Sequence, residues 1–450
     1  MPHPLLCATG KGNQLFEIAL LLATPVTHTG AIGVPATQVV VGETPAWLKT
    51  DPVGGPTTPL DALQGIALLD RLDSMPRGDV RAFLETHPEA VGALLASPPS
   101  AASVAAWWDA APASGRGTLR SLAPQLVGNL EGVPYRARDL ANRDVLQETG
   151  RQIDARLRSG TVGRAERREL EARRHMLGEI ERALTTGGER RRLVGLDVTG
   201  EGRAVIAVGD LATADYVSYL VPGMFFGVDA QIDAWTATAQ TLVDEQLRRL
   251  EALHPGEHPT VAAVAWIGYT TPSLVNVASM ELAREGRDAL TASLTGLRAA
   301  RGDDQPYLAV LAHSYGSTAA LLSLAEDDVS VDALAVVGSP GSPARSASEL
   351  HVTDGNVWVG AAEWDPIPAS GVFGSQPASR AYGAHLFSVA AGVDPLTGEQ
   401  LAGAITHNDY FAAGGMSLRN LALIAIGEGE QVVGPDHARG DFARAFTRVR

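Results

Sequence analysis

Cysteine is almost absent from this 450-residue sequence, and lysine is nearly as rare. Cys7 is the single cysteine, so an intramolecular disulfide is impossible and a cysteine-based zinc site has too few ligands. Cys7 lies near the N-terminus without a local signature, which favours an inert side chain. The two lysines, Lys11 and Lys49, are far from the glycine-containing stretch GSPGS at 338–342. That stretch therefore has neither the spacing nor the lysine of a phosphate-binding loop.

Positive charge is in the minority. The chain has 36 basic against 51 acidic residues, a net charge of −15 and a pI near 5.2. Because nucleic-acid affinity depends largely on an excess of cations, this composition argues against a nucleic-acid partner. Apolar residues make up 45% of the chain, which is ordinary for a globular protein. A chain of this length can bury a sizeable core, in several domains or in one with a large appendage.

Long apolar runs are also missing. The stretch FEIALLLATPV is too short to cross a bilayer, and no other run reaches about 18 apolar residues. The chain has no cationic residue before Lys11, so its start does not resemble a signal peptide. The sequence therefore predicts no transmembrane segment and, by default, a cytoplasmic protein. Export without a cleaved signal stays open.

Residues 1–188 predict a mainly helical N-terminal region. From Pro59 onward, apolar residues recur at the three- and four-residue spacing of helices. Residues 134–158 and 163–186 predict two long charged helices joined by SGTVG, which gives a helical hairpin at about 134–186. Arginine and glutamate alternate along it, a pattern typical of a solvated helix face. A basic binding surface is the alternative interpretation.

Residues 189–450 alternate strands and helices. RRLVGLDV-TGEG-RAVIAVGD predicts a β-hairpin. Further strands are predicted at ADYVSYLVPG, TVAAVAWIGY, YLAVLAHS, ALAVVGSPG, VWVGAAEWDPI and HLFSVA. Apolar strands separated by crossover helices are typical of an α/β fold with a mostly parallel central sheet and helices on both faces. Ligands of such sheets bind outside the carboxyl ends of the strands.

One of these strand ends carries a candidate nucleophile. The strand YLAVLA runs into AHSYG at 312–316, which is the G-x-S-x-G pattern with alanine in the first place. In this pattern a sharp turn exposes the serine at a helix N-terminus, and small flanking residues let the strand and the helix pack closely. We therefore predict Ser314 as a nucleophile and the N–H of Tyr315 as an oxyanion donor. The alternative is that Ser314 only caps the helix.

A nucleophilic serine needs a base, and the base needs an orienting acid. The chain order for this type of serine is serine, acid, histidine. Asp365, at the end of the strand VWVGAAEW, is the predicted acid, with an Asp-Pro turn as the alternative. His407 lies in a loop before the last predicted helix, and we favour it as the base over His437 in the tail.

A second oxyanion donor is expected in the loop VPGMFFG that follows the third core strand. Met224 N–H is the first candidate and Gly223 N–H the second, because glycine lets the backbone approach a substrate closely. Phe225 and Phe226 either line an acyl pocket or belong to the core. His313, beside the serine, is assigned to the same substrate pocket. No metal-ligand set and no cofactor-binding motif stand out, so neither is expected.

The motifs AHSYGSTAA, AVVGSPG, WVGAAEWDPI, YGAHLF, HNDYF and SLRNLALIAIG together resemble an actinobacterial family of α/β-hydrolases of largely unassigned substrate. Upstream, WWDAAP and LAPQLVGNLEGVPYRARDLANRDVL resemble the helical region that precedes the hydrolase domain in that family. The resemblance covers roughly residues 100–428. It implies the α/β-hydrolase fold for residues 189–450, with Ser314, Asp365 and His407 as the triad. The alanine that opens AHSYG departs from the usual glycine.

These expectations converge on a cofactor-free serine hydrolase that cleaves carboxylic esters, esterase- or lipase-like, through an acyl-enzyme. The expected partner is a small-molecule or lipid-like acyl ester. Two alternatives stay open. The same triad serves amidases, peptidases and acyltransferases, and the hydrolase domain could be weak or inactive within a binding or export-associated protein. The helical region would then be a binding module, whereas in an enzyme it could form a lid.

Overall fold

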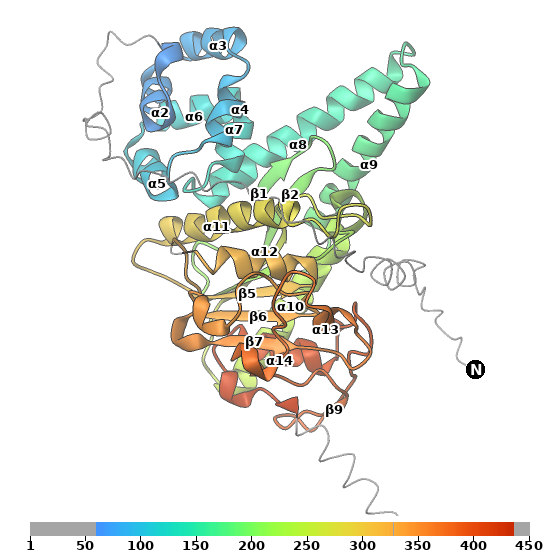
Figure 1. Ribbon diagram of the computed structural model, residues 1–450. Coiled ribbons are helices and arrows are strands. Elements are labelled where there is room, and N and C mark those ends of the chain that lie inside the picture. Colours follow the sequence, from blue (N-terminus) through green and yellow to red (C-terminus); the bar gives the residue numbers. More distant parts are fainter. Residues whose placement is uncertain (1–59, 327, 436–450) are drawn as a thin grey trace, which may run out of the picture.

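The computed structural model describes residues 60–326 and 328–435. Its centre is an eight-stranded sheet with the order β1-β2-β4-β3-β5-β6-β7-β8 (Figure 1). β1 and β2 form the predicted antiparallel hairpin, β2 also pairs antiparallel with β4, and the other pairs are parallel. The strands are β1 (Arg191–Asp197), β2 (Arg203–Val208), β3 (Tyr216–Val221), β4 (Val261–Ile267), β5 (Tyr307–His313), β6 (Ala333–Val337), β7 (Val357–Gly360) and β8 (His385–Leu386).

Helices cover both faces of this sheet. α10 and α14 pack on one face and α11 and α12 on the other, so the central strands β4 and β6 are buried along their whole length. This burial explains their unbroken apolar sequences. The helices are α10 (Val228–Leu253), α11 (Glu281–Arg301), α12 (Tyr315–Ser323), α13 (Ile367–Ser370) and α14 (Met416–Ile424). The predicted fold class is confirmed.

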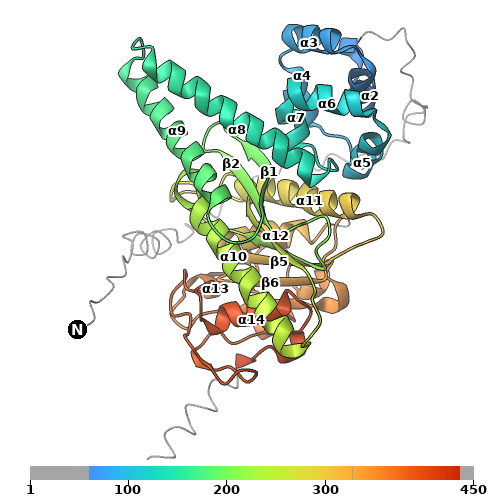
Figure 2. The same cartoon turned by 180° about the vertical axis from the view of Figure 1, so that it is seen from behind.

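The described part of the N-terminal region is helical. Six short helices gather around a separate apolar core, in which Trp107 Nε1–H donates to Asp73 Oδ2 (2.8 Å). Figure 2 shows this group beside α11, where α5 makes the contact. The helices are α2 (Gly65–Ser74), α3 (Arg77–Thr86), α4 (Ala90–Ala96), α5 (Ala101–Ala110), α6 (Ala113–Leu122) and α7 (Pro124–Asn129).

The charged hairpin consists of α8 (Tyr135–Arg158) and α9 (Arg164–Thr185), which project from the sheet as an arm (Figures 1 and 2). Its apolar side chains, among them Ile153, Leu177 and Ile180, share one core with α10 and the sheet. The hairpin therefore buries one face and leaves the other charged. Because helices on both sides of residue 188 contribute to this core, the domain boundary there stays a prediction.

The strand predicted at HLFSVA is wrong in length. Only His385 and Leu386 pair with β7, opposite Trp358 and Val359. The chain then runs from residue 387 to 415 with only the short pair β9 (Gly392–Val393) and β10 (Gln400–Leu401). Asp394, fully buried, anchors this segment through ion pairs with Arg249 and Arg419. The segment carries His407.

The expectations for Cys7, for residues 1–59 and for His437 lie outside the described residues. In the described ranges, no helix combines the length and the apolar character needed to cross a membrane.

Candidate active site

Ser314 occupies the sharp turn between β5 and α12. Its backbone has φ 53° and ψ −131°, a conformation that L residues rarely adopt. Gly316 makes the turn possible, because a Cβ at this position would collide with the carbonyl oxygen of Pro222. The Ser314 side chain makes no capping hydrogen bond to α12, which speaks against the interpretation as a helix cap.

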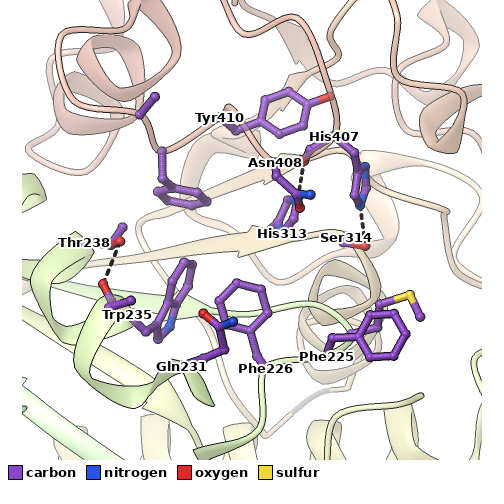
Figure 3. Close-up of a pocket in the computed structure, with 14 residues that line it drawn as sticks. Phe225, Phe226, Gln231, Trp235, Thr238, His313, Ser314, His407, Asn408 and Tyr410 are labelled. Atoms are coloured by element: carbon purple, nitrogen blue, oxygen red, sulfur yellow. Dashed lines mark hydrogen bonds between the residues drawn. The ribbon is translucent and has the colours of Figure 1, made fainter. Parts of the chain in front are cut away.

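A continuous chain of hydrogen bonds joins the three predicted triad residues. Ser314 Oγ lies 2.8 Å from His407 Nε2 (Figure 3). On the other side of the ring, His407 Nδ1 lies 2.8 Å from Asp365 Oδ2. All three side chains are buried. Because a carboxylate only accepts, His407 Nδ1–H donates to Asp365, and His407 Nε2 is left to accept from the Ser314 hydroxyl. The residues come from the segments that follow β5, β7 and β8.

Three donors hold the Asp365 carboxylate. Besides His407, the Tyr410 hydroxyl donates to Oδ2 (2.6 Å) and the Ile367 N–H donates to Oδ1 (3.0 Å). Burial acts to raise the pKa of Asp365, but the hydrogen bond and charge of His407, with the bond from Tyr410, bring it below its usual value. The group is therefore an ionised carboxylate near neutral pH.

Tyr410 is a site residue that the sequence analysis missed. Its hydroxyl accepts from the Ala362 N–H (2.9 Å) while it donates to Asp365, and its side chain is fully buried. It thereby ties the end of β7 to the loop of His407. The available signal was its position three residues after His407 in HNDYF.

His313 lines the cavity beside Ser314 and also contacts His407. Its Nε2–H donates to the backbone oxygen of His407 (2.7 Å), and the two rings lie 4.7 Å apart. Burial, and then the proximity of His407, lower the pKa of His313 to about 3. His313 is therefore neutral across the physiological range.

We expect His313 to make the fold less stable in acid. In the folded state it stays unprotonated down to about pH 3, whereas in the unfolded chain it binds a proton below its ordinary pKa of 6.5. Stability due to this group should therefore decline as the pH falls through this window, by up to about 1.4 kcal/mol per pH unit. Urea unfolding over a pH series measures the slope.

His313→Gln keeps a side-chain N–H donor but cannot titrate, so its unfolding free energy should fall less steeply in acid than that of the wild type. His258→Gln, at an exposed histidine, is the matched control and should keep the wild-type slope. Equal slopes for the wild type and His313→Gln would contradict the neutral, buried state of His313.

The predicted oxyanion loop packs directly on the serine. A Cβ at Gly223 would lie 2.6 Å from the Cβ of Ser314, so only glycine allows this approach. Phe225 has φ 60°, and its N–H donates to the carbonyl oxygen of Pro272 (3.1 Å), which fixes the turn. Within the described part of the chain, the N–H groups of Met224 and Tyr315 donate to no protein acceptor. Both are thus available to a ligand.

A cavity of about 540 Å³ opens beside Ser314 and His407 (Figure 3). Its size falls in the range of small-molecule sites. Edge-to-face aromatic contacts build one wall, with Trp235 against Phe226 (4.9 Å between ring centroids) and against Phe411 (5.3 Å). Phe225 is 44% exposed at the rim, whereas Phe226 is partly buried on the core. The remaining lining residues are Met224, Gln231, Ala234, Thr238, His313, Asn408, Tyr410 and Ala412.

No lining residue of this cavity comes from the described helices before β1, so these helices do not form its wall. The lid interpretation of the helical region therefore gains no support from this cavity. Between residues 60 and 435, with residue 327 left out, no cluster of His, Cys, Asp and Glu side chains could hold a metal ion.

The chain is similar to known proteins over much of its length. Residues 197–374 match the family model described as Alpha/beta hydrolase, a span that includes Ser314 and Asp365. Uncharacterized protein Rv2079 of Mycobacterium tuberculosis is 28% identical, over 72% of this chain and 55% of that protein, and its counterpart in a second strain gives the same values. The chain thus spans about half the length of the curated relatives it matches.

Two solved esterase structures are similar at a lower level. Carboxyl esterase 2 from Tuber melanosporum has 13% identity, covers 55% of this chain and 89% of its own, and gives a TM-score of 0.32. A thermostable esterase from Pseudomonas putida has 13% identity, with 63% and 94% coverage and a TM-score of 0.29. These values are too low to bear on the substrate. The family match, with the sheet described above, confirms the resemblance stated from the motifs: the chain contains an alpha/beta hydrolase domain preceded by a largely helical region.

Proposed function

We propose that the protein is a serine esterase that cleaves carboxylic esters through an acyl-enzyme on Ser314. The observation that carries the proposal is the hydrogen-bonded chain from Ser314 through His407 to Asp365 at a cavity of about 540 Å³. A strained serine at a strand-to-helix turn, bonded to a histidine rather than to its own helix, is better suited to nucleophilic attack than to capping. This favours an active enzyme over an inactive binding domain.

Acylation would begin with attack of Ser314 Oγ on the ester carbonyl. His407 Nε2 takes the hydroxyl proton, and Asp365 orients the imidazole and stabilises its charged form. The carbonyl oxygen becomes an oxyanion, which accepts hydrogen bonds from the N–H groups of Met224 and Tyr315. Collapse of the tetrahedral intermediate expels the alcohol, which receives its proton from His407.

Deacylation repeats the same steps with water as the nucleophile. His407 removes a proton from the water, which attacks the acyl carbon and forms a second tetrahedral intermediate. As this collapses, the bond to Ser314 Oγ breaks, His407 returns the proton to Oγ, and the carboxylic acid is released. Every proton transfer in this cycle uses side chains of the chain itself, so the proposal needs no cofactor. An alcohol in place of water would make the enzyme an acyltransferase, and an amide in place of the ester an amidase.

Two matched substrates test the proposal. We expect p-nitrophenyl butyrate to be hydrolysed with an initial burst of about one nitrophenol per active site, because nitrophenol is a good leaving group and acylation should be faster than deacylation. The anilide of the same acid should be cleaved at least about 100-fold more slowly, because its amine leaving group must be protonated to depart. The measurements are stopped-flow absorbance and intact mass after rapid quenching.

The outcomes separate the alternatives. Faster cleavage of the anilide would identify an amidase. Transfer of the acyl group to an added alcohol in preference to water would identify an acyltransferase. Absence of turnover and of any acyl adduct, across several acyl lengths, would favour an inactive domain in a binding protein over an esterase.

A further inference from the structure

The catalytic base proposed above sits in a segment with little regular structure. Between the end of β8 and the start of α14, the described chain contains only the two-residue strands β9 and β10. The position of the His407 ring therefore depends on individual contacts rather than on a sheet or helix. A displacement of about 1 Å between reacting groups can cost about 100-fold in rate.

Local contacts shape the turn before His407 and leave room for its ring. Asp409 Oδ2 accepts the N–H groups of Thr406 (2.7 Å) and Ile405 (3.1 Å), which closes the turn on itself. Gly338, at φ 60°, faces the ring, since a Cβ there would lie 2.9 Å from His407 Cε1. These contacts define the turn, but they do not set its distance from Ser314.

His313 joins this turn to the nucleophile. It is the last residue of β5 and immediately precedes Ser314, and its Nε2–H donates to the backbone oxygen of His407 (2.7 Å). The bond is buried, so it is electrostatically stronger than the same bond in water would be. One side chain thus links the strand that carries the nucleophile to the backbone of the base.

The neutral state of His313 suits this position. A histidine donates from Nε2 and stays uncharged only in the tautomer that has its proton there. During the proposed reaction His407 becomes an imidazolium, and its ring centroid lies 4.7 Å from that of His313. A second positive charge at this distance would oppose proton uptake by His407, whereas a neutral donor does not.

We propose that His313 is a positioning residue, whose hydrogen bond to the His407 backbone sets the distance between His407 Nε2 and Ser314 Oγ. The inference rests on the proposed function. It goes beyond the sequence-based assignment of His313 to the substrate pocket, because the residue acts through the base and not through contact with substrate.

The test compares three variants of the full chain with p-nitrophenyl butyrate. His313→Phe keeps an aromatic ring in the buried space but has no donor, and we expect kcat to fall about 10- to 100-fold with little change in KM. His313→Gln, whose amide can donate from a similar position, should recover most of kcat. His258→Gln, at the exposed histidine, should match the wild type.

A residue that only lines the substrate pocket would give another pattern. KM would then rise with kcat unchanged, and it would rise for Gln as well as for Phe. That outcome, or wild-type kcat in His313→Phe, would overturn the proposal. The rate of labelling by a fluorophosphonate, which needs the Ser314–His407 contact but little of the pocket, should fall in parallel with kcat in His313→Phe.

A measurement on the wild type keeps the proposal testable if His313→Phe does not fold. In nitrogen-15 spectra of the histidine-labelled protein, His313 should be a neutral Nε2–H tautomer at neutral pH, assigned by its loss in His313→Gln. An Nδ1–H tautomer or an imidazolium would rule out the bond. These spectra do not depend on turnover. They therefore distinguish failure of this inference from failure of the proposed function, in which the wild type would have no esterase activity.

Discussion

Ser314→Ala is expected to abolish ester turnover, with kcat at least about 10⁴-fold below the wild type, and to prevent covalent labelling by a fluorophosphonate. In the proposed mechanism the hydroxyl is the group that attacks, and alanine has nothing to replace it. The fold should stay nearly intact, because the change removes one atom, whose hydrogen-bond partner among the described residues is His407. Intact mass after incubation with the probe is the measurement, with one adduct expected on the wild type and none on the variant.

Ser323→Ala is the matched control for this experiment. Ser323 is the last residue of α12, the helix that Ser314 precedes. Its side chain is also buried, and its hydroxyl shares a hydrogen bond with that of Thr291 (2.8 Å). It should label like the wild type. Labelling of Ser314→Ala would show that the probe reacts with another residue, which would then be the nucleophile. An unlabelled wild type would show that Ser314 is not activated or not reachable.

The constellation around Ser314 could be anticipated because its members occur at ends of regular elements. Apolar strands and the short motif AHSYG fix where β5 stops, and chain order then selects Asp365 after β7 and a loop histidine after it. Such reasoning needs only local patterns and the rule that parallel strands present their carboxyl ends on one edge. The structure brings Ser314, Asp365 and His407 within hydrogen-bond distance.

The supporting residues could not be anticipated in the same way. Tyr410 and the bond from His313 depend on the path of a segment that has almost no periodic pattern, so no sequence rule says which way its side chains point. Tyr410 could have been a surface residue on the same sequence. In the structure it is fully buried and bonds to Asp365, within the segment that Asp394 ties to Arg249 and Arg419.

The charged hairpin of α8 and α9 shows a second limit of prediction from sequence patterns. Alternating arginine and glutamate predict a solvated face, and that face exists, with Arg156–Glu166 (2.7 Å) and Arg174–Asp154 (3.3 Å) joining the two helices. The pattern does not reveal what covers the opposite face, because apolar residues at helical spacing fit any partner. In the structure that partner is α10 and the sheet.

Asp365→Asn is expected to lower kcat by about 10³- to 10⁴-fold while KM changes little. The carboxylate accepts from His407 Nδ1–H and so keeps His407 Nε2 free to take the Ser314 proton. An asparagine can offer an N–H there instead, which favours the opposite tautomer of His407, and it has no charge to stabilise the imidazolium. Steady-state kinetics on p-nitrophenyl butyrate give the comparison.

Two further variants separate the charge of Asp365 from its surroundings. Tyr410→Phe removes one of the three donors on the carboxylate but leaves its charge and its bond to His407, so a loss of no more than about 10-fold is expected. Glu363→Gln changes the exposed carboxylate two residues earlier and should leave kcat unchanged. Because Asp365 is buried and Glu363 is not, a large loss at Glu363 with none at Asp365 would mean that His407 is oriented by a different acid from the one bonded to it in this structure.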